Sequence, residues 1–380
     1  MSAKRLRVLF WHWGRRGGGP RYTYELVRAL AKRGDLDVHL SLSRQSEIFE
    51  EFENLNLPSC HINTYNGRLS AAFGALRLPG VRRRLWRYVE DAGIDVVVGT
   101  MSHLWNVPML AGRFSKVPYL MVVHDALPHP GDDLPLRHWL LKREIGFSHG
   151  VVALTEHVRR ILCDEYAYPA RRTWVIPLGA FSYGRPLSMP RASGPTRLLF
   201  FGRVLPYKGL DLLLEAYTVL RRERKDIELM ISGPGDLSPY EGQLRCLEGV
   251  SIDNRWILEK EIGPIFRGAD VSILPYREAS QSGVIATAYA AGVPVVITPV
   301  GGLAEQVKHE QTGLVCASAS PKGIADALRR MLDEPGLLAR CAKGASQEAE
   351  VELAWPSIAS HFSRAIEEVL LAGRHDRGAG

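Results

Sequence analysis

Two basic side chains stand between the end of an apolar run and the start of a periodic one. Arg203 and Lys208 follow the run RLLFFG (197–202) and flank the turn before residues 209–222, where apolar residues recur at helical spacing. Cations fixed beside the end of a buried strand can stabilise a pyrophosphate, because charge-assisted hydrogen bonds are strong and need no rearrangement. Two solvated loop charges are the alternative interpretation, and this pair alone does not decide between them.

A second candidate anion site lies where Ser282 and Gly283 open an expected helix within LPYREASQSGVIATAYAAGVPVV (274–296). The first N–H groups of a helix have no partner inside the helix, and its positive dipole end favours an anion. Glycine at this position lets the backbone approach a phosphate closely. An ordinary strand-to-helix connection with a serine cap is the alternative, and the pairing with Arg203 and Lys208 favours the anion site.

Short apolar runs alternate with helix-like patterns along the whole chain. Several runs are almost continuously apolar, as expected of parallel strands buried on both faces. The alternation predicts βαβ units, and therefore an α/β fold with doubly wound parallel sheets. The expected strands are 5–11, 37–43, 94–100, 119–125, 150–155, 174–179, 197–202, 227–233, 271–276, 294–299 and 313–316, and the clearest later helices are 209–222, 283 onward, 321–333 and 355–371.

The length of 380 residues exceeds what one hydrophobic core usually supports and predicts two domains. Residues 181–197 hold three prolines, two glycines and three serines without apolar periodicity, which is typical of a linker between domains. Ligands of doubly wound sheets bind beyond the carboxyl ends of the strands. Arg203, Lys208 and Ser282 are all expected at such ends.

Composition sets the broad class. Apolar residues make up 46% and charged residues 23%, which is ordinary for a globular protein. The net charge of +7 suits an anionic ligand or membrane surface and is modest for a dedicated nucleic-acid binder. Five dispersed cysteines without a CxxC pair predict reduced thiols in a cytoplasmic protein. The short N-terminal apolar run, broken by His12, is predicted to be a buried strand and not a signal peptide, and no run approaches the length of a membrane span.

Several segments together resemble glycosyltransferase family 4. In the second half of the chain they are FFGRVLPYKG (200–209), GPGD (233–236), the block at 274–296 and VGGLAEQV (300–307). In the first half they are the glycines 17–19, VVHDALPHPGD (122–132), ALTEHV (153–158) and VIPLGA (175–180). The similarity covers nearly the whole chain in the right order. It implies a retaining enzyme of GT-B architecture, in which two Rossmann-like domains face a cleft.

The resemblance also implies a domain layout. Residues 1–185 would form the acceptor side and residues 193–352 the side that holds the nucleotide-sugar donor. Residues 353–380 would form a C-terminal helix that crosses back to the N-terminal domain, followed by a tail. By the same resemblance, Arg203 and Lys208 contact the donor diphosphate.

Further site residues follow from the resemblance alone. Backbone donors to phosphate or sugar hydroxyls come from Ser282, Gly283 and Val284. Near the donor phosphate and the acceptor, the cleft is lined by Gly17, Gly18 and Gly19. The side chain that faces the reacting sugar is His124.

One departure from the family concerns two glutamates that many members carry with seven residues between them. An ungapped comparison places Ala279 and Thr287 at those positions. Glu278 lies one residue early and could substitute for the first glutamate. Thr287 could hydrogen-bond a ribose hydroxyl, more weakly than a carboxylate. Glu305 is expected to orient the donor ribose, with helix capping as the alternative.

Other patterns carry less. His124, Asp125 and the nearby His129, Asp132 and Asp133 match no zinc spacing, and the family needs no metal at the donor, so no metal is expected. The glycine-rich segment 14–22 lacks GxGxxG, which argues against a nicotinamide cofactor. Trp256 follows an expected strand near the family's base-binding position; it is expected to be a core residue, with a stacking platform as the alternative.

The segment VRRRLWRYVE (81–90) concentrates arginines beside Trp86. It could lie on an anionic membrane and serve a lipid-linked acceptor. The favoured interpretation is a domain helix with an exposed basic face and its apolar side in the core.

Together these patterns predict transfer of a sugar from a nucleoside-diphosphate sugar to a hydroxyl acceptor, without a cofactor or a nucleic-acid partner. The acceptor could be a glycan, a lipid-linked molecule or a small molecule, in polysaccharide, glycolipid or other glycoconjugate biosynthesis. A non-catalytic or divergent protein that binds a sugar nucleotide remains an alternative. So does an epimerase or inverting transferase of the same architecture, with Asp125 as a conceivable base.

Overall fold

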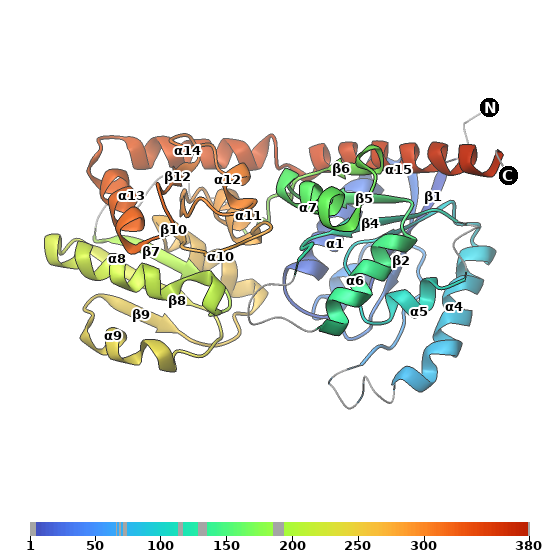
Figure 1. The fold of residues 1–380 in the computed structure, drawn as a ribbon, viewed down its shortest axis with the longest axis horizontal. Helices are drawn as coiled ribbons and strands as arrows, with labels where there is room; N and C mark the ends of the chain where they lie inside the picture. Colours follow the sequence, from blue (N-terminus) through green and yellow to red (C-terminus); the bar gives the residue numbers. More distant parts are fainter. Residues whose placement is uncertain are drawn as a thin grey trace. The chain divides into compact units, whose positions relative to one another are not determined.

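A computed structural model describes residues 5–65, 67, 70, 74–112, 117–127, 135–184 and 194–378. Among these residues the chain forms two compact units (Figure 1). The first unit comprises the described parts of Met1–Leu127 and Leu134–Leu178 together with Trp355 onward, and the second comprises those of Gly179–Ala354. Most of the linker expected at 181–197 lies outside the described residues.

The first unit is built on a six-stranded parallel sheet with the order β2-β1-β3-β4-β5-β6. All six strands expected from the first half of the sequence are present. Five lie within about two residues of their predicted ends, whereas the sixth ends at Val175, before the predicted end at residue 179. The strands are β1 Leu6–His12, β2 Leu36–Leu42, β3 Val96–Gly99, β4 Tyr119–Val123, β5 Gly150–Ala153 and β6 Thr173–Val175. The helices are α1 Gly18–Arg33, α2 Phe49–Glu53, α4 Leu78–Asp91, α5 Asn106–Leu110, α6 Pro135–Phe147, α7 Glu156–Tyr166 and α15 Trp355–Gly378, with short 3-10 turns η1 Ala75–Arg77 and η2 Ala170–Arg172.

Alternation along β1 divides the first unit into two packed layers. Trp11 lies in the cluster that includes Trp86 of α4, whereas Phe10 meets Phe362 of α15 with ring centroids 6.4 Å apart. Along α15, apolar residues at helical spacing from Ile358 to Val369 are fully buried, which explains why this last helix belongs to the first unit.

The second unit repeats the plan with the strand order β12-β11-β10-β7-β8-β9. Its strands are β7 Thr196–Phe201, β8 Ile227–Ser232, β9 Val250–Asp253, β10 Val271–Leu274, β11 Val295–Ile297 and β12 Gly313–Val315. Its helices are α8 Leu210–Glu223, α9 Glu241–Cys246, α10 Glu259–Arg267, α11 Gly283–Ala290, α12 Leu303–Gln306, α13 Pro321–Asp333 and α14 Leu337–Glu350, with 3-10 turns η3 Pro206–Lys208 and η4 Ser238–Tyr240.

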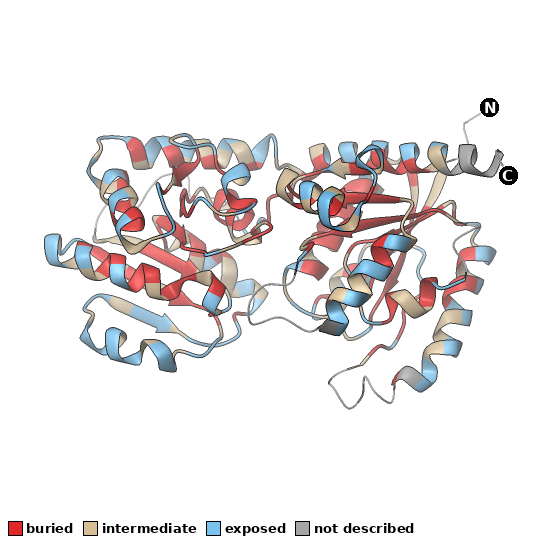
Figure 2. Cartoon of the chain, in the orientation of Figure 1, coloured by how far each residue is buried: buried red, intermediate tan, exposed pale blue. Residues whose placement is uncertain are grey.

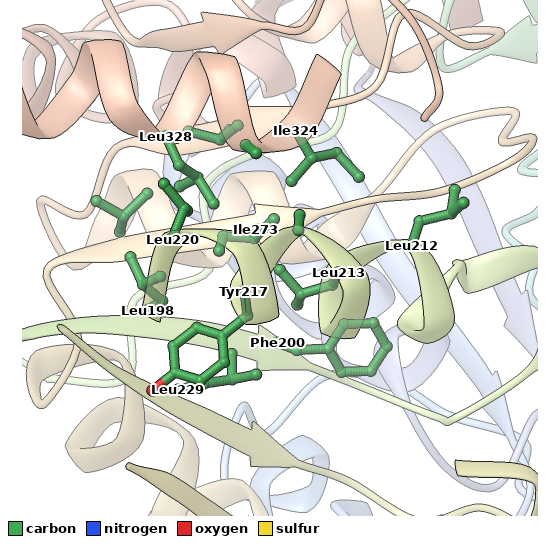
Figure 3. Packing of buried hydrophobic residues seen from close by; sticks show 14 of the residues in the cluster. Leu198, Phe200, Leu212, Leu213, Tyr217, Leu220, Leu229, Ile273, Ile324 and Leu328 are labelled. Atoms are coloured by element: carbon green, nitrogen blue, oxygen red, sulfur yellow. The ribbon is translucent and has the colours of Figure 1, made fainter. Parts of the chain in front are cut away.

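Each face of this second sheet carries its own core. Leu198 and Phe200 of β7 pack with Leu213 and Tyr217 of α8 and with Leu328 of α13 (Figure 3). Buried residues run along the central strands of both sheets, and only the edge strand β9 is largely exposed (Figure 2). The predicted fold class, α/β with two doubly wound parallel sheets, is confirmed.

The strand orders create a switch point in each sheet. In the second unit the chain moves from β7 toward β8 and β9, and later from β10 in the opposite direction toward β11 and β12. In the first unit the equivalent switch lies between β1 and β3. At such points the loops after two neighbouring strands separate, which leaves room for a ligand at the carboxyl edge of the sheet.

The basic segment 81–90 falls in α4, with its apolar side chains directed into the core. Leu85, Trp86 and Val89 are buried, and the Trp86 indole donates to the Met109 carbonyl at 2.8 Å. Arg83 and Arg87 are exposed. The favoured interpretation of this segment as a domain helix is therefore confirmed. Of the helices in the described residues, none combines the length and the apolar composition needed to cross a membrane.

A buried carboxyl group lies between α6 and the sheet. Glu144 is 1% exposed, and its Oε1 accepts from Asn106 Nδ2 and from the Tyr119 hydroxyl, both at 2.6 Å. Its Oε2 has no hydrogen-bond partner. Burial raises the pKa of Glu144 to about 7, against the lowering effect of hydrogen bonds from Tyr119, Asn106 and Ser102. The carboxyl therefore keeps its proton at pH values where an unfolded chain would release it.

We expect Glu144→Gln to stabilise the protein above pH 7. As the pH rises from about 4.5 to 7, Glu144 ionises in the unfolded wild type but not in the folded state. The free energy of unfolding of the wild type therefore falls by up to about 3 kcal/mol. The amide avoids this cost and still accepts from Asn106 and Tyr119. Chemical denaturation at pH 5 and pH 8 should show the advantage of the variant growing with pH, and a difference independent of pH would contradict the assignment.

Candidate active site

Lys208 is held at the switch point of the second unit. Its Nζ donates to the Tyr276 hydroxyl at 2.7 Å and lies 4.2 Å from the centroid of the Tyr276 ring. Lys208 comes from the loop after β7, and Tyr276 from the loop after the neighbouring strand β10. Because Tyr276 is only 2% exposed, its ring is a fixed platform for the half-buried ammonium group.

The two loops are tied together by backbone as well as side chains. Gly209 has φ +65°, and a Cβ there would lie 2.0 Å from the Pro275 carbonyl oxygen, so only glycine permits this approach. The Arg277 amide donates to the Tyr207 carbonyl at 2.7 Å. The Arg277 guanidinium pairs with Asp211 at the start of α8, which lowers the pKa of that carboxyl. These contacts fix where Lys208 lies relative to the loop that leads into α11.

Arg203, the second predicted cation, directly follows Gly202 at the end of β7 and is exposed. The structure therefore places Arg203, Lys208 and the start of α11 on loops that leave the carboxyl ends of the adjacent strands β7 and β10. This is the edge at which the sequence predicted an anion site.

The start of α11 is capped as the sequence predicted. Ser282 Oγ accepts from the Val284 amide at 3.3 Å, and Ser282 is 4% exposed. Gln306 Oε1 accepts from the Ser282 amide at 2.7 Å. Within the described residues the Gly283 amide has no protein acceptor, so it remains available at the positive end of the helix. Gln306 was missed, although it stands beside Glu305 in the VGGLAEQV motif.

The residues proposed for the sugar and ribose lie around this helix. Glu278 is half-buried in the loop before α11, whereas Ala279 beside it is buried in the core. The Thr287 hydroxyl donates to the Gly283 carbonyl at 2.9 Å, which leaves its oxygen lone pairs for a ligand. Glu305 is exposed on the short helix α12. Their contacts with a ligand remain predictions.

In the first unit, a buried histidine stands behind the glycine-rich turn between β1 and α1. His12 Nδ1 lies 3.0 Å from the hydroxyl oxygens of both Thr23 and Thr100, and the Thr23 hydroxyl donates to the Gly19 carbonyl at 3.0 Å. A Cβ at Gly19 would come within 2.8 Å of Met101. The predicted glycines 17–19 therefore form the N-terminus of α1 at the β1–β3 switch point.

His124 follows β4 and is oriented by a backbone contact. Its Nε2 donates to the Thr100 carbonyl at 2.9 Å, and its ring meets the Tyr22 ring edge-on at 5.0 Å. Because a carbonyl can only accept, Nε2 carries the proton, and the Nδ1 of the neutral ring has a lone pair for a hydroxyl donor. The sequence selected His124 but gave no signal for His12 or Thr100, which share no motif.

Burial keeps this cluster uncharged. Burial lowers the pKa of His12 to about 3, helped by the nearby His124 and His103. Burial and the neighbouring Arg15 lower the pKa of His103 to about 3, and burial also lowers the pKa of His124. The first unit therefore offers neutral imidazoles at its switch point, whereas the second offers cations.

Three remaining expectations can be placed. Trp256 is 40% exposed, so the expectation that it is a core residue was wrong: it lies in the loop after β9, at the edge of the sheet. Within the described residues no three potential metal ligands cluster; His129, Asp132 and Asp133 lie outside them. All five cysteines are free, as predicted.

Comparison with known proteins agrees with this geometry. The family model described as Glycosyltransferase Family 4 matches residues 16–180, and that described as Glycosyl transferases group 1 matches residues 195–334. A glycogen synthase of Mycobacterium tuberculosis is 32% identical over 295 residues, covering 72% of this chain and 68% of the relative. The chain belongs to glycosyltransferase family 4 and is thus a glycosyltransferase, as the sequence motifs predicted.

Two further comparisons concern the fold and the share of each chain that is matched. A D-inositol 3-phosphate glycosyltransferase of Pseudarthrobacter chlorophenolicus is 29% identical over 66% of this chain and 63% of its own length, so the match spans under two thirds of that relative. The crystal structure of Anabaena HepE in complex with UDP and glucose has a TM-score of 0.74 at 16% identity, covering 96% of this chain and all of HepE. The predicted GT-B fold is confirmed.

The neutral histidines predict an acid-sensitive first unit. As the pH falls below about 6.5, an unfolded histidine takes up a proton that the folded site refuses, so each one removes about 1.4 kcal/mol of stability per pH unit until its folded pKa is reached. Denaturation curves between pH 7 and pH 5 should show a shallower pH dependence for His12→Gln than for the wild type. The exposed His309 provides the matched control, and a His12→Gln slope equal to that of the wild type would refute the assignment.

Proposed function

We propose that the chain transfers a sugar from a nucleoside-diphosphate sugar to a hydroxyl acceptor and retains the anomeric configuration. The observation that carries this proposal is the fixing of Lys208 by Tyr276 on the loop that leads to the α11 start. A mobile ammonium would pay an entropic cost to bind phosphate, and a fixed one does not. Arg203, Lys208 and the Gly283 amide are the groups proposed to hold the diphosphate.

In the proposed step the bond between the anomeric carbon and the leaving phosphate oxygen breaks, and the acceptor oxygen bonds to the same face of that carbon. The acceptor hydroxyl gives its proton to the departing phosphate. Lys208, Arg203 and the backbone at Ser282 to Val284 stabilise the negative charge that grows on the diphosphate. No side-chain nucleophile and no metal take part.

The first unit is proposed to bind the acceptor and the reacting sugar. Glycines 17, 18 and 19 let a ligand approach the start of α1 closely. The unprotonated Nδ1 of His124 accepts from a sugar hydroxyl, and the ring stays neutral because burial lowers its pKa. In the second unit, Glu278 is proposed to face the donor sugar, with Thr287 and Glu305 toward the ribose.

The printed names of the relatives suggest substrates to try. HepE has been solved with UDP and glucose, so UDP-glucose is the first donor to test. The named relatives include a glycogen synthase and an inositol-phosphate glycosyltransferase, whose acceptors differ in charge. Polysaccharide, glycolipid or other glycoconjugate synthesis is the proposed setting.

The test is donor hydrolysis and transfer with a panel of UDP-, GDP- and ADP-sugars. Wild type should release nucleotide, and Arg203→Ala or Lys208→Ala should lower kcat/KM by about a hundredfold each, because each removes one charge from the leaving diphosphate. The exposed Lys322→Ala on α13 is the control and should keep full turnover. Chelation by EDTA should not slow the wild type.

The outcomes separate the alternatives. Nucleotide binding without release by the wild type would favour a non-catalytic protein, and full activity of Lys208→Ala would remove the proposed site. Product NMR decides the stereochemistry, since inversion at the anomeric carbon would exclude the retaining step.

The role of Tyr276 gives a separate prediction. Tyr276→Phe keeps the ring under Lys208 and removes only the hydroxyl, so we expect donor affinity to fall about tenfold while the fold is unchanged. Tyr217→Phe is the control. It removes a hydroxyl of α8 that donates to the Glu248 carbonyl, and it should leave donor affinity intact. Equal donor affinities of wild type and Tyr276→Phe would show that the platform does not position Lys208.

A further inference from the structure

A second polar cavity lies within the first unit, beside the chain that follows β2. Its volume is about 480 Å³, within the range of small-molecule sites. Its wall includes Gln45, Asn63, Thr64 and Tyr65, and Arg77 lines it from the turn before α4. Amide, hydroxyl, aromatic and guanidinium groups of this kind make hydrogen bonds to a polar ligand.

One oxygen acceptor of this wall, Gln45 Oε1, is already occupied by the protein. Gln45 Oε1 accepts from the Thr64 amide at 2.7 Å and lies 3.2 Å from the Thr64 hydroxyl. Gln45 Nε2 donates to Asn63 Oδ1 at 3.3 Å. Gln45 Oε1 therefore has little capacity left for the protons of a ligand, whereas Asn63 Oδ1 keeps one lone pair.

Its donors, in contrast, are left over. In the part of the chain that the structure describes, the Asn63 Nδ2 group, the Tyr65 hydroxyl and the Arg77 guanidinium make no hydrogen bond to protein. These groups together present more N–H and O–H bonds than the wall can accept. A ligand that complements them must be rich in acceptor oxygens.

The charge around the cavity has the same sign. The Arg15 guanidinium lies 5.1 Å from the centroid of the Tyr65 ring, and the His103 ring stacks on Tyr65 at 5.3 Å and 23°. Neither Arg15 nor Arg77 forms an ion pair with a described residue, and no carboxylate is among the described lining residues. The cavity is therefore electropositive, with its aromatic wall held by stacking.

Backbone contacts join this cavity to the glycine-rich turn of the proposed reaction site. The Gly17 amide donates to Glu47 Oε1 at 2.6 Å, and the Glu47 amide donates to the Arg15 carbonyl at 2.9 Å. Glu47 thus holds the chain that carries Gln45 against the turn at the start of α1. A ligand in the cavity would lie next to that turn.

We propose that this cavity binds the anionic group of the acceptor, which we infer to be a sugar or polyol that carries a phosphate or a carboxylate. The inference rests on the proposed function, because it assigns the acceptor of that reaction. Phosphate and carboxylate oxygens accept hydrogen bonds without donating, which matches the unpaired donors of Asn63, Tyr65 and Arg77. A neutral sugar has no negative charge to pair with Arg77, so it would form only the weaker neutral hydrogen bonds in this cavity.

The experiment titrates the full chain with glucose 6-phosphate, glucuronate and glucose, followed by ligand-observed NMR. At least one anionic probe should bind about tenfold or more tightly than glucose, since charge-assisted hydrogen bonds are the stronger ones. Arg77→Gln and Tyr65→Phe should each weaken that probe about tenfold, because each removes one unpaired donor. Arg83→Gln removes an exposed arginine of α4 that does not line the cavity, and should change nothing.

The outcomes decide the proposal and separate it from the transfer reaction. Binding of glucose 6-phosphate alone assigns a phosphorylated acceptor, and binding of glucuronate alone assigns a uronate. Equal binding of glucose, no binding of any probe, or equal losses in Arg83→Gln and Arg77→Gln would overturn it. Donor turnover without anion binding leaves the proposed function and removes the cavity assignment. Anion binding without donor turnover removes the proposed function, and the cavity is then an anion site but not an acceptor site.

Discussion

The contact between Lys208 and Tyr276 is the interaction on which the candidate donor site depends. It joins the loops after β7 and β10. These strands are neighbours because the chain adds β8 and β9 on one side of β7, and later adds β10, β11 and β12 on the other side. Gly209 permits the close backbone approach, and the Arg277–Asp211 ion pair fixes it at the start of α8. A parallel sheet without this reversal would place the two loops apart. The cation is thus positioned by topology first and by side-chain contacts second.

The two units use opposite electrostatics at equivalent switch points. The second unit presents an ammonium, a guanidinium and a helix N-terminus, all suited to a diphosphate. The first unit buries His12 and His124 behind the glycine-rich turn, where burial lowers the pKa of both rings. Neutral imidazoles can exchange hydrogen bonds with hydroxyl groups without competing for the phosphate. In the same unit, Arg15 and Arg77 lie beside the separate polar cavity and give it a positive charge.

Local patterns predicted most elements and the positions of the strongest site residues. Nearly continuous apolar runs identified the strands, and the serine at position 282 does cap α11. Residues that act through contacts with distant parts of the sequence were not predicted. In the sequence, Tyr276 was assigned to the end of a strand, Gln306 belongs to a motif without a stated role, and His12 only interrupts an apolar run. Trp256 was expected in the core because tryptophan usually is, yet it follows the edge strand β9 and is 40% exposed.

By itself the sequence determined the α/β class, the two sheets, the family and the presence of cations and a capped helix at strand ends. The class, the sheets and the capped helix follow from hydrophobic periodicity and local hydrogen bonding, which act over a few residues, whereas the family follows from the resemblance of its motifs. Only the tertiary structure decided that Lys208 rests on Tyr276, that Gln306 holds Ser282, and that the Gln45 cavity has unpaired donors and no carboxylate among its described lining residues. Those facts depend on which strands are neighbours and on which hydrogen bonds remain after packing, and no local pattern encodes either.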